Sequence, residues 1–139
     1  MTAKEYLEQA FRLDQRINSK IAQVGALHEL ATKATSTISD MPRSATPNVH
    51  RMEDIIVKIF SLENEINADI DALVDLKRNI VRAIKAVENT EYQTLLEKRY
   101  LSFEKWEQIA VDMSYSMQYA FRMHDRALAQ VEDLLKRGE

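Results

Sequence analysis

Residues 52–87 read MEDIIVKIFSLENEINADIDALVDLKRNIVRAIKAV, and this stretch decides the fold. An apolar residue stands at every seventh position without a miss: Met52, Ile59, Ile66, Leu73, Ile80 and Val87. The intermediate heptad positions are also apolar except for Asp69, and they hold Ile55, Leu62, Leu76 and Ala83. Five such heptads predict a coiled-coil-like helix, which would be about 60 Å long from residue 48 to residue 87.

The residues before this helix predict its partner. Residues 2–38 carry a second apolar repeat with alternating spacings of three and four, broken only at Lys20: Ala10, Leu13, Ile17, Val24, Leu27, Ala31, Ala34 and Ile38. Residues 39–48 contain both prolines of the chain, Pro42 and Pro47, and show no periodicity, which predicts a linker. We therefore expect residues 1–88 to form a long antiparallel helical hairpin.

The apolar stripe of residues 52–87 is wider than a simple seam. Ile56, Ile70 and Ile84 extend it on one flank, so we expect a third helix to cover it, from the C-terminal segment or from another subunit. Because isolated two-helix hairpins bury little surface, we expect a homo-oligomer. Asp69, inside the seam, either sets the register of the helix pair or faces a solvent-filled gap.

Composition excludes several classes of protein. The chain of 139 residues has two Gly and two Pro, which favours long helices, and no Cys, which excludes thiol catalysis and thiolate metal sites. Its 19 Lys and Arg against 22 Asp and Glu argue against a basic nucleic-acid coat protein. It shows neither a membrane-spanning apolar run nor a signal-peptide pattern, so we expect no membrane partner and a soluble, all-α, cytoplasmic protein.

Residues 89–139 predict a module of shorter helices. Thr90 and Gln93 have the spacing of a capping box, and Ser102 is the expected N-cap of a helix over residues 103–113. A turn at residues 114–115 follows, and Ser116 is the expected N-cap of the last helix. The inward face of that helix is predicted from spacings of three and four: Ala120, Met123, Ala127, Leu128, Val131 and Leu134 or Leu135. This order of elements is typical of a helix-turn-helix.

The module also resembles a known family. The segment WEQIAVDMSYSMQYAFRMHDRAL, residues 106–128, is similar to the helix-turn-helix of sigma-factor region 4 at residues 108–110, 113–116 and 126–128. Its part YSMQYAFRMHDRAL looks like small phage proteins of Gram-positive bacteria, including late-gene transcription regulators of the ArpU and RinA type. The resemblance covers residues 90–135 and implies DNA and RNA polymerase as partners in the cytoplasm of a bacterial host. Ser114 stands where this turn usually has Gly.

The resemblance implies a DNA-reading surface at the start of the last helix: Ser116, Met117, Gln118, Tyr119, Phe121, Arg122 and Arg126. Gln118 suits adenine and Arg122 suits guanine or phosphate. The large apolar and aromatic members would touch thymine methyl groups or form a protein interface. Residues 90–139 hold seven Lys and Arg against nine Asp and Glu, a net charge of −2. We therefore expect weak DNA binding alone, strengthened by oligomerisation or docking on RNA polymerase.

Residues suited to catalysis or metal binding are scattered. His28 lacks the second His of a helical zinc motif, and His50 with Glu53 gives only two ligands. We expect His124 to pack or form a hydrogen bond beside the inward stripe of the last helix. The sequence thus predicts no enzyme, metal, cofactor or small-molecule substrate.

Three function classes follow. The first is a phage or prophage DNA-binding transcription regulator. The alternatives are a phage small terminase subunit in DNA packaging and a helical protein-interaction module without DNA binding.

Overall fold

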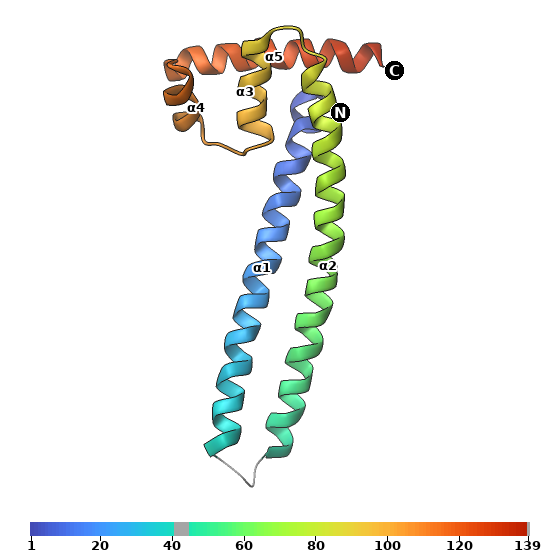
Figure 1. Ribbon diagram of the computed structural model, residues 1–139, viewed down its shortest axis with the longest axis vertical. Coiled ribbons are helices and arrows are strands. Elements are labelled where there is room, and N and C mark those ends of the chain that lie inside the picture. The colour runs from blue at the N-terminus through green and yellow to red at the C-terminus, as the bar shows by residue number, and fades with distance from the viewer. Residues whose placement is uncertain (41–44, 139) are drawn as a thin grey trace. The chain divides into compact units, whose positions relative to one another are not determined.

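The protein is all-α, as the sequence predicts. Its computed structural model describes residues 1–40 and 45–138, with side chains for residues 1–34 and 50–138. Five helices make up this described part (Figure 1): α1 (Ala3–Asp40), α2 (Ala45–Lys85), α3 (Thr90–Tyr100), α4 (Trp106–Met113) and α5 (Met117–Arg137). Across these residues, no helix is both long enough and apolar enough to cross a membrane.

The chain divides into two compact units. One is Gln15–Ala72, and the other joins Met1–Asp14 to Leu73–Glu139. This grouping differs from the predicted division at residues 88 and 89, because the first turns of α1 and the last turns of α2 pack with the C-terminal helices. We call the two units the hairpin unit and the C-terminal unit.

The hairpin unit is an antiparallel pair of helices, as the two apolar repeats predict. Within it α1 and α2 run side by side in opposite directions (Figure 1). The seam buries apolar side chains of both helices: Ile17, Ala34, Ile55, Ile59 and Ile66. Inside the seam, Lys20 Nζ lies 2.7 Å from Asp69 Oδ2. The two polar residues that break the apolar repeats are therefore partners of each other.

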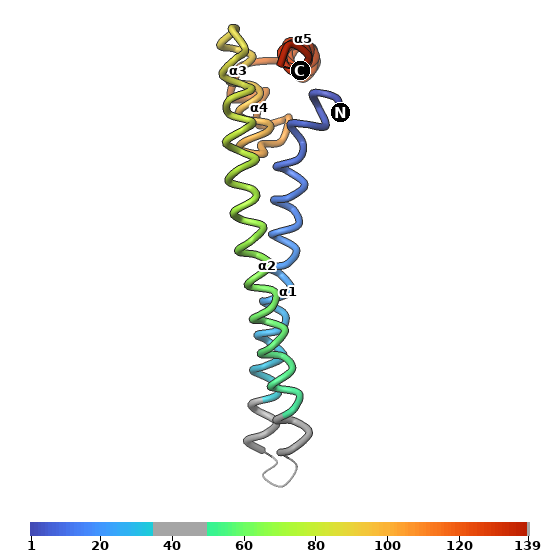
Figure 2. The backbone as a smooth tube through the Cα atoms, turned by 90° about the vertical axis from the view of Figure 1, so that its right-hand side faces the viewer, coloured from blue at the N-terminus to red at the C-terminus, as the bar shows by residue number. Residues whose placement is uncertain are grey.

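The C-terminal unit has a hydrophobic core of its own. The core contains residues of all five helices and of the connection after α2: Ala3, Leu7, Ala10, Ile80, Ile84, Val87, Leu95, Leu96, Tyr100, Ile109, Met123, Ala127 and Val131. Figure 2 shows the first turns of α1 beside α5. There the backbone N–H of Ala3 donates a hydrogen bond to Glu132 Oε2 at 2.8 Å. The start of the chain is thus part of the same packed body as its last helix.

The wide flank of α2 is covered at one end only. Ile84 is fully buried in the core of the C-terminal unit, whereas Ile56 and Ile70 are 55% and 41% exposed. The expectation of a third helix is therefore met within the chain at Ile84. Nothing in the described residues covers Ile56 and Ile70 to the same degree.

Three predicted helix ends are wrong in detail. The predicted linker of residues 39–48 is shorter, because α1 continues to Asp40 and α2 begins at Ala45. Pro47 lies in the first turn of α2, where its missing N–H removes no helical hydrogen bond; Pro42 lies outside the described residues. The N-cap of α3 is Asn89 rather than Thr90, since the Asn89 carboxamide accepts hydrogen bonds from the N–H groups of residues 91 and 92.

The third error concerns α4. This helix begins at Trp106, and its N-cap position is Lys105 rather than Ser102. Residues 101–105 instead form a connection in which Phe103 adopts the left-handed conformation, with φ of 58°. The Phe103 ring packs edge-on against Phe11 at 5.5 Å and lies under the Lys77 ammonium at 4.8 Å. These contacts from distant parts of the sequence hold the connection out of the helix.

Candidate nucleic-acid interface

The turn between α4 and α5 has a defined geometry. Ser114 adopts the left-handed conformation at φ 59° and ψ 40°, and the N–H of Tyr115 donates to the carbonyl of Ala110 at 2.8 Å. Ser116 then caps α5, as predicted, because its hydroxyl accepts a hydrogen bond from the N–H of Tyr119 at 3.1 Å. Three residues, 114–116, therefore connect α4 to α5.

Aromatic and small residues pack α4 against α5. Ile109 on α4 and Ala120 on α5 are fully buried. The Trp106 ring packs edge-on against Phe121 at 5.2 Å and against His124 at 4.7 Å between centroids. The inward stripe predicted for the last helix is confirmed at Ala120, Met123, Ala127 and Val131, which are all buried. The opposite face of α5 is thereby directed outward.

A buried polar contact fixes α5 to α3. The hydroxyl of Tyr100 and Nε2 of His124 form a hydrogen bond at 2.5 Å, as expected for a polar group beside the inward stripe. Burial lowers the pKa of His124 to about 4, so the imidazole is neutral at physiological pH. Burial, followed by the nearby charge of Glu8, raises the pKa of Tyr100 far above its usual value. Both groups therefore stay uncharged within the core.

Three of the predicted DNA-reading residues share one outward face. Gln118, Arg122 and Arg126 are exposed and follow one another at intervals of four residues, so they lie on successive turns of α5. Ser116 lies at the start of that face, where its hydroxyl caps the helix, and Met117 is half-buried beside it.

The two predicted aromatic residues are directed elsewhere. Phe121 is 44% exposed but leans on Trp106, and Tyr119 is 38% exposed but packs edge-on against Tyr115 at 4.7 Å. The Tyr115 hydroxyl in turn donates to a carboxylate oxygen of Glu91 at 2.8 Å. Each ring therefore supports the packing around α4 and α5 and also forms part of their surface.

Two cations on α3, Lys98 and Arg99, already have partners within residues 89–139. Lys98 Nζ lies 3.7 Å from Glu104 and 3.5 Å from Asp112, and the Arg99 guanidinium stacks over Trp106 at 4.9 Å. Arg99 also donates to the carbonyl of Glu104 at 3.0 Å. Sequence patterns did not reveal these roles, because the partners lie in α4 and in the connection before it, outside the helix that carries the two cations. Arg122 and Arg126 thus supply the outward positive charge of the first half of α5.

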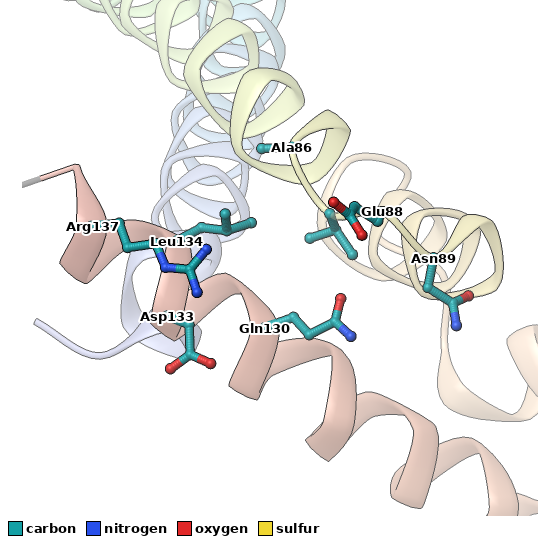
Figure 3. Close-up of a pocket in the computed structure, with 8 residues that line it drawn as sticks. Ala86, Glu88, Asn89, Gln130, Asp133, Leu134 and Arg137 are labelled. Carbon is teal, nitrogen blue, oxygen red and sulfur yellow. The ribbon is translucent and has the colours of Figure 1, made fainter.

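A polar cleft of about 440 Å³ lies at the other end of α5. The lining joins the connection between α2 and α3 (Ala86–Asn89) to four residues of α5, as Figure 3 shows: Gln130, Asp133, Leu134 and Arg137. The charges around it are of both signs. Within the described residues, no three His, Cys, Asp or Glu side chains gather closely enough to hold a metal ion.

Comparison with known proteins gives one match. The family model DUF1492, described as a protein of unknown function, matches residues 35–132, which is most of the chain and includes α2 to α4 entire. No curated protein and no solved structure matches.

Proposed function

The chain belongs to the DUF1492 family, and we propose that its C-terminal helices bind DNA as a helix-turn-helix. In this proposal α4 crosses the DNA backbone and α5 enters the major groove. The observation that carries it is the outward face of α5, which presents Gln118, Arg122 and Arg126 on successive turns above a buried opposite face. Together with the resemblance of residues 106–128 to sigma-factor region 4, this favours a phage or prophage transcription regulator acting in the cytoplasm of a bacterial host.

The exposed residues suit distinct contacts with DNA. A carboxamide such as Gln118 pairs with the N6 and N7 edge of adenine, and a guanidinium such as Arg122 pairs with O6 and N7 of guanine. Arg126, one turn further along α5, is placed for a backbone phosphate. The capped start of α5 adds N–H groups and a positive helix end, which also favour phosphate.

The charge of the module determines how tightly this surface binds. With a net charge of −2 over residues 90–139, the module neutralises few phosphates and gains little from counterion release. One isolated copy therefore binds weakly. Useful affinity comes from a second copy on the same DNA or from simultaneous contact with RNA polymerase, each of which raises the effective concentration of the module at its site.

A specific observation favours a second candidate, docking on protein. Val111 on α4 is 73% exposed, and Phe121 and Tyr119 add partly exposed rings nearby in the sequence. Large apolar and aromatic side chains of this kind are enriched at protein interfaces. In this alternative the same helix-turn-helix recognises a protein surface, and DNA contact contributes nothing.

Selection of fragments from genomic DNA by the full-length protein, repeated over a salt titration, tests the proposal. We expect an enriched sequence at low salt that is lost as salt rises. Absence of any enriched sequence at low salt overturns DNA reading and leaves the protein-docking candidate.

Two substitutions then identify the reading surface. Gln118→Ala and Arg122→Ala should each weaken binding to the enriched site by about 5- to 150-fold, the worth of one bidentate base contact. Arg78→Ala is the matched control, because this α2 side chain is 63% exposed and lies outside the module. Equal effects of all three substitutions would argue against α5 as the reader.

A further inference from the structure

A hollow of about 480 Å³ lies in the hairpin unit, where α1 and α2 run side by side. We call it the basic groove. Its lining combines four apolar and four charged side chains: Leu27, Leu30, Lys33, Ala34, Arg51, Asp54, Ile55 and Lys58. All eight residues belong to the hairpin unit, so the shape of the groove does not depend on the C-terminal unit.

The apolar residues of the basic groove belong to the seam and its edge. Ile55 and Ala34 are 7% and 8% exposed, so the seam closes beneath the groove. Leu27 is half-buried, whereas Leu30 is 49% exposed and forms an apolar wall that solvent reaches. An apolar side chain from a partner would remove this wall from water, which is favourable.

The rim of the basic groove is positively charged. It carries three cations, Lys33, Arg51 and Lys58, against one acid, Asp54. Arg51 and Lys58 are exposed, and neither takes part in any ion pair found among the described residues. Even Asp54, three residues after Arg51 and four before Lys58, forms no ion pair with them. These two cations are therefore available to a partner that carries negative charge.

The separation of the two cations favours an extended partner. Arg51 and Lys58 are seven residues apart on α2, which is about 10.5 Å along the helix axis. One small anion would engage both only if the two long side chains bent toward each other, at a cost in side-chain entropy. A helix whose carboxylates recur every seven residues matches both cations without that cost. Its apolar residues, at spacings of three and four, would then meet Leu30.

We propose that the basic groove binds an acidic amphipathic helix of another protein, which lies along α1 and α2 as a third helix. The apolar stripe of this helix covers Leu30, and its carboxylates pair with Arg51 and Lys58. The site is separate from the proposed DNA-binding surface, because none of its residues belongs to α4 or α5. Its test therefore uses the full-length protein without DNA.

Fluorescence anisotropy of a labelled helical peptide of about 20 residues measures the binding. The Glu–Leu peptide has Leu at spacings of three and four, and Glu on both flanks of that stripe. One control peptide has Lys in place of each Glu, and the other has Ser in place of each Leu. We expect the Glu–Leu peptide to bind at least about 10-fold more tightly than either control, and rising salt should weaken its binding.

Charge reversal in the groove tests where the peptide binds. The double variant Arg51→Glu, Lys58→Glu should bind the Glu–Leu peptide at least about 10-fold more weakly and the Lys–Leu peptide more tightly than the parent protein does. Both side chains are exposed, so the variant keeps its helices, which circular dichroism checks. The matched control is Arg78→Glu, Arg126→Glu, which changes the net charge equally at exposed positions of the C-terminal unit. It should leave both affinities unchanged.

Each contrary result overturns the proposal. No binding of the Glu–Leu peptide up to about 1 mM excludes the site, and equal binding of the Glu–Leu and Lys–Leu peptides excludes selection by charge. Peptide binding that survives the double reversal in the groove places the site elsewhere. Tighter binding to phosphatidylglycerol vesicles than to the peptide, lost in the same variant, would assign the groove to a membrane surface. Self-association lost in that variant would assign it to a second copy of the chain.

Discussion

The ion pair in the seam of the hairpin unit tests what fixes the register of α1 against α2. Lys20 and Asp69 are 49 residues apart in sequence, yet their charged atoms lie 2.7 Å apart. Their side chains are only 12% and 21% exposed. Any slip of one helix along the other would leave both charges facing apolar neighbours. We therefore predict that replacing one partner is harmful and that replacing both is not.

The magnitude follows from the burial of the two charges. Removing one partner of a fully buried pair costs about 3–5 kcal/mol, because the other charge is left uncompensated. Residual exposure lets water reach the remaining group here, so we expect about 2 kcal/mol for Asp69→Leu or Lys20→Leu. The double substitution fills the seam with two apolar side chains. It should leave the free energy of unfolding unchanged or raise it by about 1 kcal/mol.

Hydrogen exchange of the amides in residues 15–72 is the assay. It reports the opening free energy of the hairpin unit separately from that of the C-terminal unit. A single unfolding curve would combine the two free energies. With about 2 kcal/mol lost in each single variant and none in the double, the double-mutant cycle should give a coupling energy of about 4 kcal/mol. The double variant should also show duplicated amide signals, because an uninterrupted apolar seam tolerates helix pairs slipped by one heptad.

The reasoning is refuted by two results. One is a single Leu variant as stable as the parent protein, which would mean that water stabilises the remaining charge as well as its partner does. The other is a coupling energy below about 0.5 kcal/mol, which would mean that the charges act independently. His50→Leu serves as the control within the hairpin unit, since its contact with Glu53 is solvent-exposed and should be worth little.

Two further predictions concern the C-terminal unit. His124 has a folded pKa of about 4 against 6.5 when unfolded, so the unfolded chain binds the extra proton and stability falls as pH drops from about 6.5 towards 4. Urea unfolding should show a loss of about 2–3 kcal/mol between pH 7 and pH 4.5. His124→Gln should show a loss smaller by that amount, and parallel pH profiles for the two proteins would contradict this cause. Ser114→Gly should raise the free energy of unfolding by about 0.5–1 kcal/mol, because relief of left-handed strain exceeds the added entropy of unfolded Gly. Ser114→Ala should bring no such gain, and a thermal melt in which the two substitutions behave alike would contradict the strain.

Local patterns in the sequence determined which segments are helical and which faces are apolar. The seven-residue repeat of residues 52–87 and the spacing on the last helix translate directly into buried faces, since a helix places every third and fourth residue on one side. Ser116 was predictable as a cap for a similar reason. The Ser116 hydroxyl accepts a hydrogen bond from the N–H of Tyr119, which lies only three residues further along the chain.

Only the tertiary structure decided which apolar flank is covered and which polar groups meet. Ile56, Ile70 and Ile84 are equivalent in sequence, but only Ile84 lies where the C-terminal helices bury it. The start of α4 at Trp106 likewise depends on Phe11 and Lys77, which hold Phe103 from far along the chain.

The residues proposed to contact DNA show the same division. Their helical spacing was evident from the sequence, whereas their outward direction depends on what buries the opposite face of α5. The pairing of Lys20 with Asp69 and of Tyr100 with His124 also depended on folding. Periodicity records the direction of each side chain about its own helix axis. It carries no information on which other helix lies on that side, and packing alone supplies that.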